Sequence, residues 1–273
     1  MAGLNLQAAC ERTRAGYGGA LICGVHHVEF IAHRGSSHLA PENTLGALRL
    51  GWSETTTCEV DVRATRDGRV IVVHDETTLR TTGVDLRVAQ HTLEQLQRLD
   101  AGAWKGAAWK GERLPSLAET IAAIPPNKRL LIEIKGGPEI IPELARVVRE
   151  SGRAESLTLQ GFDRDTCAQA KAALPEVPVH LLAFLENERQ AARAAWDVAM
   201  TIVREEKFDG IGVNPASVLG KGIAEAHDVG VKINIWTIDD VDLARLFITA
   251  KVDGIITNRP GWLKAQLSGE GQS

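Results

Sequence analysis

Charged side chains recur at two-residue spacing in two β-rich runs of the sequence. Glu59 and Asp61 lie in TCEVDV, and Glu133 and Lys135 lie in RLLIEIK. Residues two apart on a strand point to the same face, so each pair would project from one side of its strand. Three carboxylates brought together would repel one another and lose hydration, and a cation between them would offset both costs. The spacing therefore predicts a cation beside Glu59, Asp61 and Glu133.

The ligand type indicates which cation this would be. Carboxylate oxygens suit a hard divalent ion better than Zn²⁺, because neither cysteines nor closely spaced histidine pairs accompany them. We therefore expect one divalent cation, Mg²⁺ or Ca²⁺, with Mn²⁺ as a third candidate. The alternative is a metal-free ionic layer in which the same carboxylates pair with Arg34, Lys135 or Arg63. The pattern alone leaves both interpretations open.

Two of the eight histidines end strand-like runs close to these carboxylates. His33 ends VEFIAH, and His74 ends VIVVH. A single histidine carries little information, but two that flank a metal-binding site could act as a paired acid and base. Position alone does not decide between this role and a structural one.

The elements that would position these residues follow a regular alternation. From about residue 28, eight short β-branched runs alternate with helix-period segments, which is typical of βα units and a parallel sheet. Eight units in about 250 residues predict an α/β fold, the closed (β/α)₈ TIM barrel, whose active site lies at the carboxyl ends of the strands. An open doubly wound sheet is the alternative, but no G-x-G-x-x-G follows the first run. The runs are VEFIAH at Val28, TCEVDV at Thr57, RLLIEIK at Arg129, SLTLQ at Ser156, PVHLLA at Pro178, DGIGVN at Asp209, VKINIW at Val231 and DGIIT at Asp253.

Helix boundaries and one insertion can also be predicted. Apolar spacing predicts an amphipathic helix from Glu188 to Glu206, and Asn43 and Asp239 are expected to cap two other helices. Asp67-Gly68 after the second strand indicates a hairpin. It opens an insertion at about 66–113, which we expect to be a loop over one barrel mouth, the alternative being a mere insertion.

Composition restricts the class of partner. Lys and Arg number 31 against 35 Asp and Glu, and the net charge of −4 gives no broad cationic field for nucleic acid or anionic lipid. The four cysteines are scattered, which argues against disulfides or a zinc site. We expect residues 1–27 to form a leader, which lacks the features of a secretory signal, and residues 28–273 to form a single domain. No apolar run in the sequence is long enough for a membrane span. We expect a cytoplasmic protein, and composition says nothing about its oligomeric state.

Several motifs together resemble the glycerophosphodiester phosphodiesterase family, from about Val28 to Trp262. IAHRGSSHLAPENTLGAL resembles its opening motif, and CEVDVRATRDGRVIVVHDETTLRTTG resembles the second, a Glu-x-Asp-Val run followed by a hairpin and a His-Asp pair. LPSLAE, LIEIK, INIWTID and DGIITNRP follow in the family's order. Two departures are Gln160-Gly161-Phe162, where Ser-Phe is frequent, and Asn258, where Asp is frequent. We expect both to affect substrate preference rather than activity.

The resemblance implies a barrel that cleaves glycerophosphodiesters to glycerol 3-phosphate and an alcohol with a bound divalent metal. Such cleavage requires neutralised phosphate charge, an activated nucleophile and a protonated leaving group. Trp236 would form an apolar wall for the glycerol carbons, unless it is a core residue under the rim. By motif position the metal ligands are Glu59, Asp61 and Glu133, the general acid/base pair is His33 and His74, and the phosphate-binding residues are Arg34 and Lys135.

Two competing functions are weaker. A lysophospholipase D-type enzyme must accommodate an acyl chain, but the insertion has only scattered apolar residues and no basic amphipathic helix. A barrel that merely binds phosphorylated metabolites would be expected to lack a metal ligand or a histidine, and neither is missing. A small glycerophosphodiester is therefore the expected partner.

Overall fold

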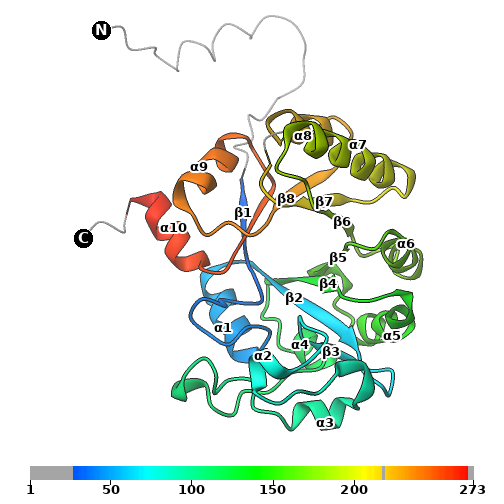
Figure 1. Cartoon of the computed structure of the whole chain (residues 1–273), viewed down its shortest axis with the longest axis vertical. Helices are drawn as coiled ribbons and strands as arrows, with labels where there is room; N and C mark the ends of the chain where they lie inside the picture. The colour runs from blue at the N-terminus through cyan, green and yellow to red at the C-terminus, as the bar shows by residue number, and fades with distance from the viewer. Residues whose placement is uncertain (1–26, 217–218, 270–273) are drawn as a thin grey trace, which may run out of the picture.

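Eight parallel strands close into a ring surrounded by helices. The computed structural model describes residues 27–216 and 219–269, so the predicted leader lies outside it except for His27. The strand order is β1-β9-β8-β7-β6-β5-β4-β2-β3, and pairing of β1 with β2 closes the ring (Figure 1). Strand β3 is antiparallel to β2 and lies outside the ring. The predicted (β/α)₈ TIM barrel is confirmed.

Each ring strand overlaps one of the eight predicted runs, and two of the strands extend one or two residues past the run. The ring strands are β1 (Glu29–Ala32), β2 (Thr57–Ala64), β4 (Arg129–Ile134), β5 (Leu157–Gly161), β6 (Val179–Ala183), β7 (Gly210–Val213), β8 (Lys232–Ile235) and β9 (Gly254–Thr257), with β3 (Val70–Val72) outside. The helices are α1 (Leu45–Glu54), α2 (Leu79–Thr82), α3 (Leu93–Gln97), α4 (Leu117–Ala122), α5 (Ile141–Ser151), α6 (Arg164–Ala173), α7 (Arg189–Glu205), α8 (Leu219–His227), α9 (Val241–Thr249) and α10 (Pro260–Ser268). Short 3₁₀ turns are η1 (Val88–Gln90), η2 (Ala107–Trp109), η3 (Pro138–Ile140) and η4 (Ala154–Ser156).

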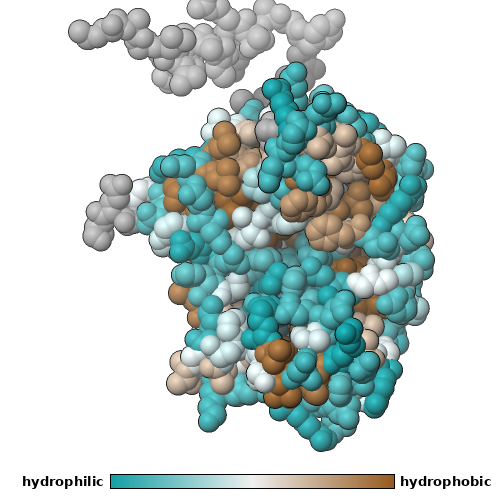
Figure 2. All heavy atoms as spheres, viewed as in Figure 1, coloured by the Kyte–Doolittle hydropathy of each residue, from teal (hydrophilic) through white to brown (hydrophobic). Residues whose placement is uncertain are grey.

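The main core lies between the strands and the surrounding helices. Trp52 on α1 and Trp196 on α7 are fully buried there. The predicted amphipathic helix is α7, and Glu188 accepts hydrogen bonds from the backbone at its first turn. The face of the molecule seen in Figure 2 is mostly hydrophilic, with apolar groups in separate patches. No helix in the described part of the chain is both long and apolar enough to cross a membrane.

Two predicted helix caps are wrong by one residue. Thr44, not Asn43, caps α1, and Asp240, not Asp239, caps α9. A capping residue needs extended backbone, whereas Asn43 has a φ of 58°. Its side chain and that of Asp239 are used instead in the site described below.

The insertion is more ordered than the predicted loop. The hairpin is confirmed, because Val62 pairs with Val72 in antiparallel register. The rest contains α2, α3 and two 3₁₀ turns, whose short lengths give little periodic signal in the sequence. It has its own small core, and Lys105 Nζ donates to the Ser37 carbonyl in the loop after β1. The core residues are Ile71, Val73, Val88, Leu96, Ala101 and Leu114.

Candidate active site

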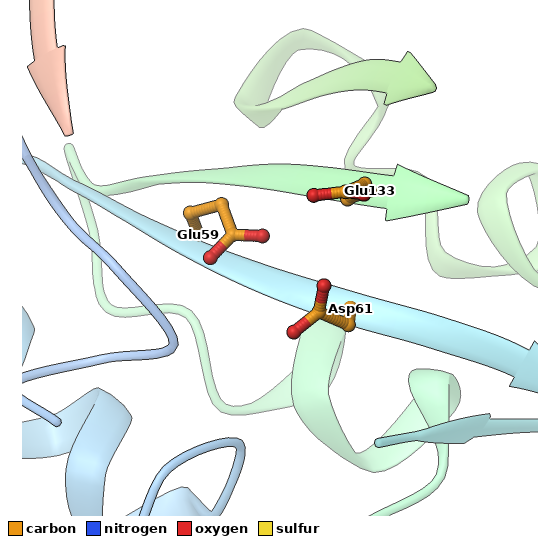
Figure 3. Close-up of side chains that lie close together, drawn as sticks. All are labelled: Glu59, Asp61 and Glu133. Carbon is orange, nitrogen blue, oxygen red and sulfur yellow. The ribbon is translucent and has the colours of Figure 1, made fainter. Parts of the chain in front are cut away.

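Three buried carboxylates converge where β2 and β4 pair. Asp61 and Glu133 are directly paired in the parallel register of these strands, and Glu59 precedes Asp61 on the same face. One oxygen of each lies within 4.8 Å of the others (Figure 3). All three are at least 93% buried, since their exposed fractions are 1% for Glu59, 0% for Asp61 and 7% for Glu133. The predicted cluster is therefore assembled.

The ionic layer that was the alternative to a metal is present but incomplete. Arg34 Nε lies 3.1 Å from Asp61 Oδ2, and Lys135 Nζ lies 3.3 Å from Asp61 Oδ1 and also contacts Glu133. Arg63 does not join them, because its Nε donates to the backbone carbonyl of His74. Arg34 is shared with a fourth carboxylate, Glu42. Arg34 and Lys135 thus face three buried carboxylates, one more than they can neutralise.

Glu59 is the carboxylate left without a cationic partner of its own. Its Oε2 accepts the Arg34 backbone N–H at 2.9 Å, while its buried Oε1 has no hydrogen-bond partner in the described structure. Burial, together with Asp61 and Glu133, raises the pKa of Glu59 well above its usual value. For Asp61, burial acts in the same direction, but Arg34 and Lys135 outweigh it and hold its pKa below the usual value. A divalent cation fits this set of hard, under-neutralised oxygens.

The loop after β1 is shaped to serve this cluster. Arg34 has a φ of 55°, the left-handed conformation that aims its N–H at Glu59. Gly35 also has positive φ, and a Cβ there would lie 2.5 Å from the Ala47 backbone, so only glycine fits. Asn43 then donates to Asp61 Oδ2 at 2.9 Å and accepts from the Asp61 N–H.

His33 is held by a chain of hydrogen bonds from the last strand. Asn258 Nδ2 donates to the Asp239 carboxylate at 2.6 Å, which turns Asn258 Oδ1 toward His33 Nδ1, 2.7 Å away. Nδ1 is therefore the donor, and Nε2, which lies 3.9 Å from Glu59, is left for a substrate. Burial, reinforced by the charge of Arg34, lowers the pKa of His33 to about 4.

His74 is oriented in a similar way, by residues of the insertion. Its Nδ1 lies 2.7 Å from Asp75 Oδ1, and since a carboxylate only accepts, Nδ1 is again the donor. Asp75 Oδ2 in turn accepts from Arg80 Nε at 2.6 Å. Burial lowers the pKa of His74 as well. Both imidazoles are therefore neutral near pH 7 with Nε2 available.

These groups line one cavity of about 240 Å³ at the carboxyl ends of the strands. Trp236 forms part of the cavity wall and also packs on the inner core residues Ile31, Leu131 and Ile256. The Phe162 ring packs edge-on against Trp236, with ring centres 5.7 Å apart. The cavity is lined by His33, Arg34, Glu59, His74, Glu133, Lys135, Gln160, Phe162, Leu182, Trp236, Thr237 and Ile256.

Several residues of the site were missed or misjudged from the sequence. Asn258 was expected to affect substrate preference only, but it hydrogen-bonds His33 and so touches the candidate acid/base pair. Gln160 lies in the cavity with a buried Oε1 that has no hydrogen-bond partner within the described ranges. Asp75 directly follows His74, and Glu42 precedes Asn43, so motif adjacency was the available signal for both.

The fold and the cavity define a class: a barrel enzyme for an anionic ester, with room for a hard cation. Comparison with known families is specific. Residues 33–262 match the model of the Glycerophosphoryl diester phosphodiesterase family. The chain belongs to this family. It is a glycerophosphodiester phosphodiesterase.

Individual relatives agree along nearly their full length. The chain is 32% identical over 238 residues to a glycerophosphodiester phosphodiesterase of Caldanaerobacter subterraneus subsp. tengcongensis, which covers 84% of this chain and 93% of the relative. Among solved structures, a phosphodiesterase of Oleispira antarctica in complex with the product sn-glycerol-3-phosphate has 26% identity and a TM-score of 0.77, with 88% and 96% covered. A glycerophosphodiester phosphodiesterase of Agrobacterium tumefaciens has 26% identity and a TM-score of 0.74, with 88% and 100% covered.

Proposed function

We propose that the protein hydrolyses small glycerophosphodiesters to glycerol 3-phosphate and an alcohol with one divalent cation, Mg²⁺ or Ca²⁺, with Mn²⁺ as a third candidate. The observation that carries this proposal is the convergence of Glu59, Asp61 and Glu133 within 4.8 Å, with Glu59 and Glu133 lining the cavity and Asp61 fully buried beside them. These three would hold the cation, which when bound would neutralise charge developing on the phosphate oxygens. The glycerol 3-phosphate bound by the Oleispira relative supports the choice of product.

Arg34 and Lys135 would bind the phosphate. Both line the cavity, and both are held there by Asp61, which keeps two flexible cationic side chains in place before a substrate enters. The carboxylates hold the pKa of Lys135 above its usual value against the opposing effect of burial, so the amine stays charged. An anion would therefore meet two preorganised cations.

His33 and His74 would transfer the protons. Each donates through Nδ1 to an oxygen acceptor and presents Nε2. The base would take a proton from the attacking group at its bare Nε2. The acid would have to enter the reaction as an imidazolium, with a second proton on Nε2 that passes to the leaving alcohol. Their lowered pKa values favour the neutral form, which is the form a general base requires. Trp236 would form the apolar wall beside the glycerol carbons.

Packing of apolar residues within the insertion disfavours an acyl-chain site there for a lysophospholipase D-type enzyme, although Leu79, Val84 and Trp104 are exposed. Leu96 and Val88 are buried in the insertion's own core, and Leu86 and Leu93 pack against it. These apolar groups are thus already used. The cytoplasmic location stays a prediction from sequence.

The two-histidine proposal can be tested with substrates that differ in leaving group. His33→Ala and His74→Ala should each lower turnover of a natural diester at least about 10²-fold, the low end of what positioned proton transfer contributes. A nitrophenyl phosphodiester releases a stable phenolate, so it should largely rescue the variant that lacks the acid but not the one that lacks the base. Both variants should still bind the cation. Near-normal turnover in either variant, or rescue of neither, would contradict the assignment.

A further inference from the structure

Arg80 lies outside the catalytic cavity, yet it binds two carboxylates that contact residues of the site. It comes from the short helix α2 in the insertion. Its Nη1 and Nη2 donate to the two oxygens of Glu42 at 2.6 and 2.8 Å, and its Nε donates to Asp75 Oδ2 at 2.6 Å. One guanidinium thus bridges the loop after β1 and the loop after β3.

Each of those carboxylates continues to a residue of the site. Glu42 Oε1 also accepts from Arg34 Nη1 at 2.9 Å, and Arg34 is the candidate phosphate ligand. Asp75 Oδ1 binds Nδ1 of His74, the candidate proton-transfer residue, at 2.7 Å. A continuous ionic chain therefore joins two functional side chains that come from different loops.

We propose that Arg80 is a positioning residue for the reaction. Through Glu42 it fixes the place of Arg34. Through Asp75 it fixes the orientation of His74. The inference rests on the proposed roles of Arg34 and His74, and it gives the insertion a part in the site beyond that of a surface addition.

The planar guanidinium of Arg80 has the shape needed to bind Glu42 and Asp75 at the same time. Three N–H groups of one rigid plane contact two carboxylates, which sets the distance between Glu42 and Asp75. A lysine has a single nitrogen on a flexible stem, so it can supply the charge but not the fixed separation. Charge and positioning can therefore be separated by substitution.

Stability and catalysis should respond differently to the loss of this side chain. The Arg80 side chain is 45% exposed, and ion pairs at such positions contribute little to the free energy of unfolding. A misplacement of about 1 Å in a catalytic group can nevertheless cost about 10²-fold in rate. We expect the variants at position 80 to fold normally and to be poor catalysts.

The test uses Arg80→Ala, Arg80→Lys and a matched control, Arg87→Ala, in the full-length protein with its divalent cation. Arg87 belongs to the same insertion and pairs with Glu76 at 3.1 Å, with both side chains exposed and away from the cavity. With glycerophosphocholine as substrate, Arg80→Ala should raise KM and lower kcat, with kcat/KM reduced about 10²-fold. Arg80→Lys should recover less than a tenth of the lost kcat/KM, and Arg87→Ala should leave both constants unchanged.

Chemical rescue distinguishes positioning from a general structural effect. Because the site of the missing side chain is open to solvent, millimolar methylguanidinium should restore kcat/KM of Arg80→Ala at least fivefold and leave Arg87→Ala unaffected. The thermal unfolding midpoint of each variant, measured in parallel, should match the wild type. Wild-type constants in Arg80→Ala, full activity in Arg80→Lys, or losses that methylguanidinium does not restore would overturn the proposal.

His74→Ala in the same assay separates this inference from the proposed function. If His74→Ala loses turnover while Arg80→Ala keeps it, the positioning role fails and the two-histidine proposal stands. If His74→Ala keeps turnover, the proton-transfer role proposed for His74 fails, and the chain from Arg80 to His74 has no catalytic residue to position.

Discussion

The hydrogen bond from Asn258 to Asp239 decides which nitrogen of His33 carries its proton, and Asp239→Asn should reverse that choice. Asp239 Oδ1 accepts from the Asn258 N–H and from Thr257 Oγ1, while Oδ2 accepts from Asn258 Nδ2. In the variant, the new amide can keep the first two bonds with its oxygen. Its NH₂ group then faces that of Asn258, so the Asn258 amide would turn over and present NH₂ to His33.

The magnitude follows from the bond that is lost. A hydrogen bond to a charged group contributes about 1.5–3 kcal/mol, and about 1.4 kcal/mol is a factor of ten in an equilibrium. The catalytic arrangement of His33 should therefore become roughly 10-fold to 150-fold less populated. We expect kcat to fall by that factor, with KM for a glycerophosphodiester nearly unchanged because the phosphate ligands are untouched.

The neighbouring residue provides the control. Asp240 caps α9 by accepting from the Leu243 N–H, and asparagine caps a helix about as well as aspartate. Asp240→Asn should therefore keep both kcat and the unfolding midpoint. Combining Asp239→Asn with His33→Ala should add nothing to the loss from His33→Ala alone, since both act through one imidazole. Wild-type kcat in Asp239→Asn, or additive losses in the double variant, would refute the reasoning.

Two further outcomes are expected from other parts of the barrel. Lys135→Met should lower kcat/KM about 10-fold to 100-fold for every glycerophosphodiester alike, because the phosphate is their shared part; a loss selective for one headgroup in steady-state kinetics would contradict this. His180 is buried in β6, and burial lowers its pKa from 6.5 to about 4, so the unfolded chain binds that proton more tightly. The contribution of His180 to the free energy of unfolding is therefore fully present above pH 6.5. It is lost as the pH falls toward 4, and its size is roughly 3 kcal/mol. His180→Asn should lose correspondingly less stability than wild type between pH 7 and pH 4.5 in denaturant unfolding, and equal losses would count against it.

The barrel and the metal-ligand candidates could be predicted because they depend on local patterns. Strand periodicity places Glu59 and Asp61 on one face regardless of what surrounds them, and parallel register then brings Glu133 beside Asp61. The alternation of eight short β-branched runs with helical segments favours the closed barrel, with an open doubly wound sheet as the alternative. Strand periodicity and the alternation of strands with helices can be recognised without knowing any long-range contact.

The supporting contacts could not be predicted in the same way. His33 and Asn258 are 225 positions apart, and nothing in either neighbourhood indicates that they hydrogen-bond. Asn43 and Asp239 both precede helices, so the sequence pattern predicts helix caps at these positions. Their side chains instead bind Asp61 and Asn258. The left-handed backbone at Asn43 removes it from the cap, and tertiary contacts rather than local preference decide where both side chains point.

Metal depletion followed by reconstitution tests whether the three carboxylates hold a catalytic cation. After exhaustive chelation, release of glycerol 3-phosphate from glycerophosphocholine should stop, and Mg²⁺, Ca²⁺ or Mn²⁺ should restore it, because every candidate ligand is a hard oxygen. Glu133→Gln, which preserves volume and removes one charge, should require a higher concentration of the same cation for half-maximal activity. Full activity after chelation, or an unchanged cation requirement in Glu133→Gln, would return Glu59, Asp61 and Glu133 to a purely ionic layer.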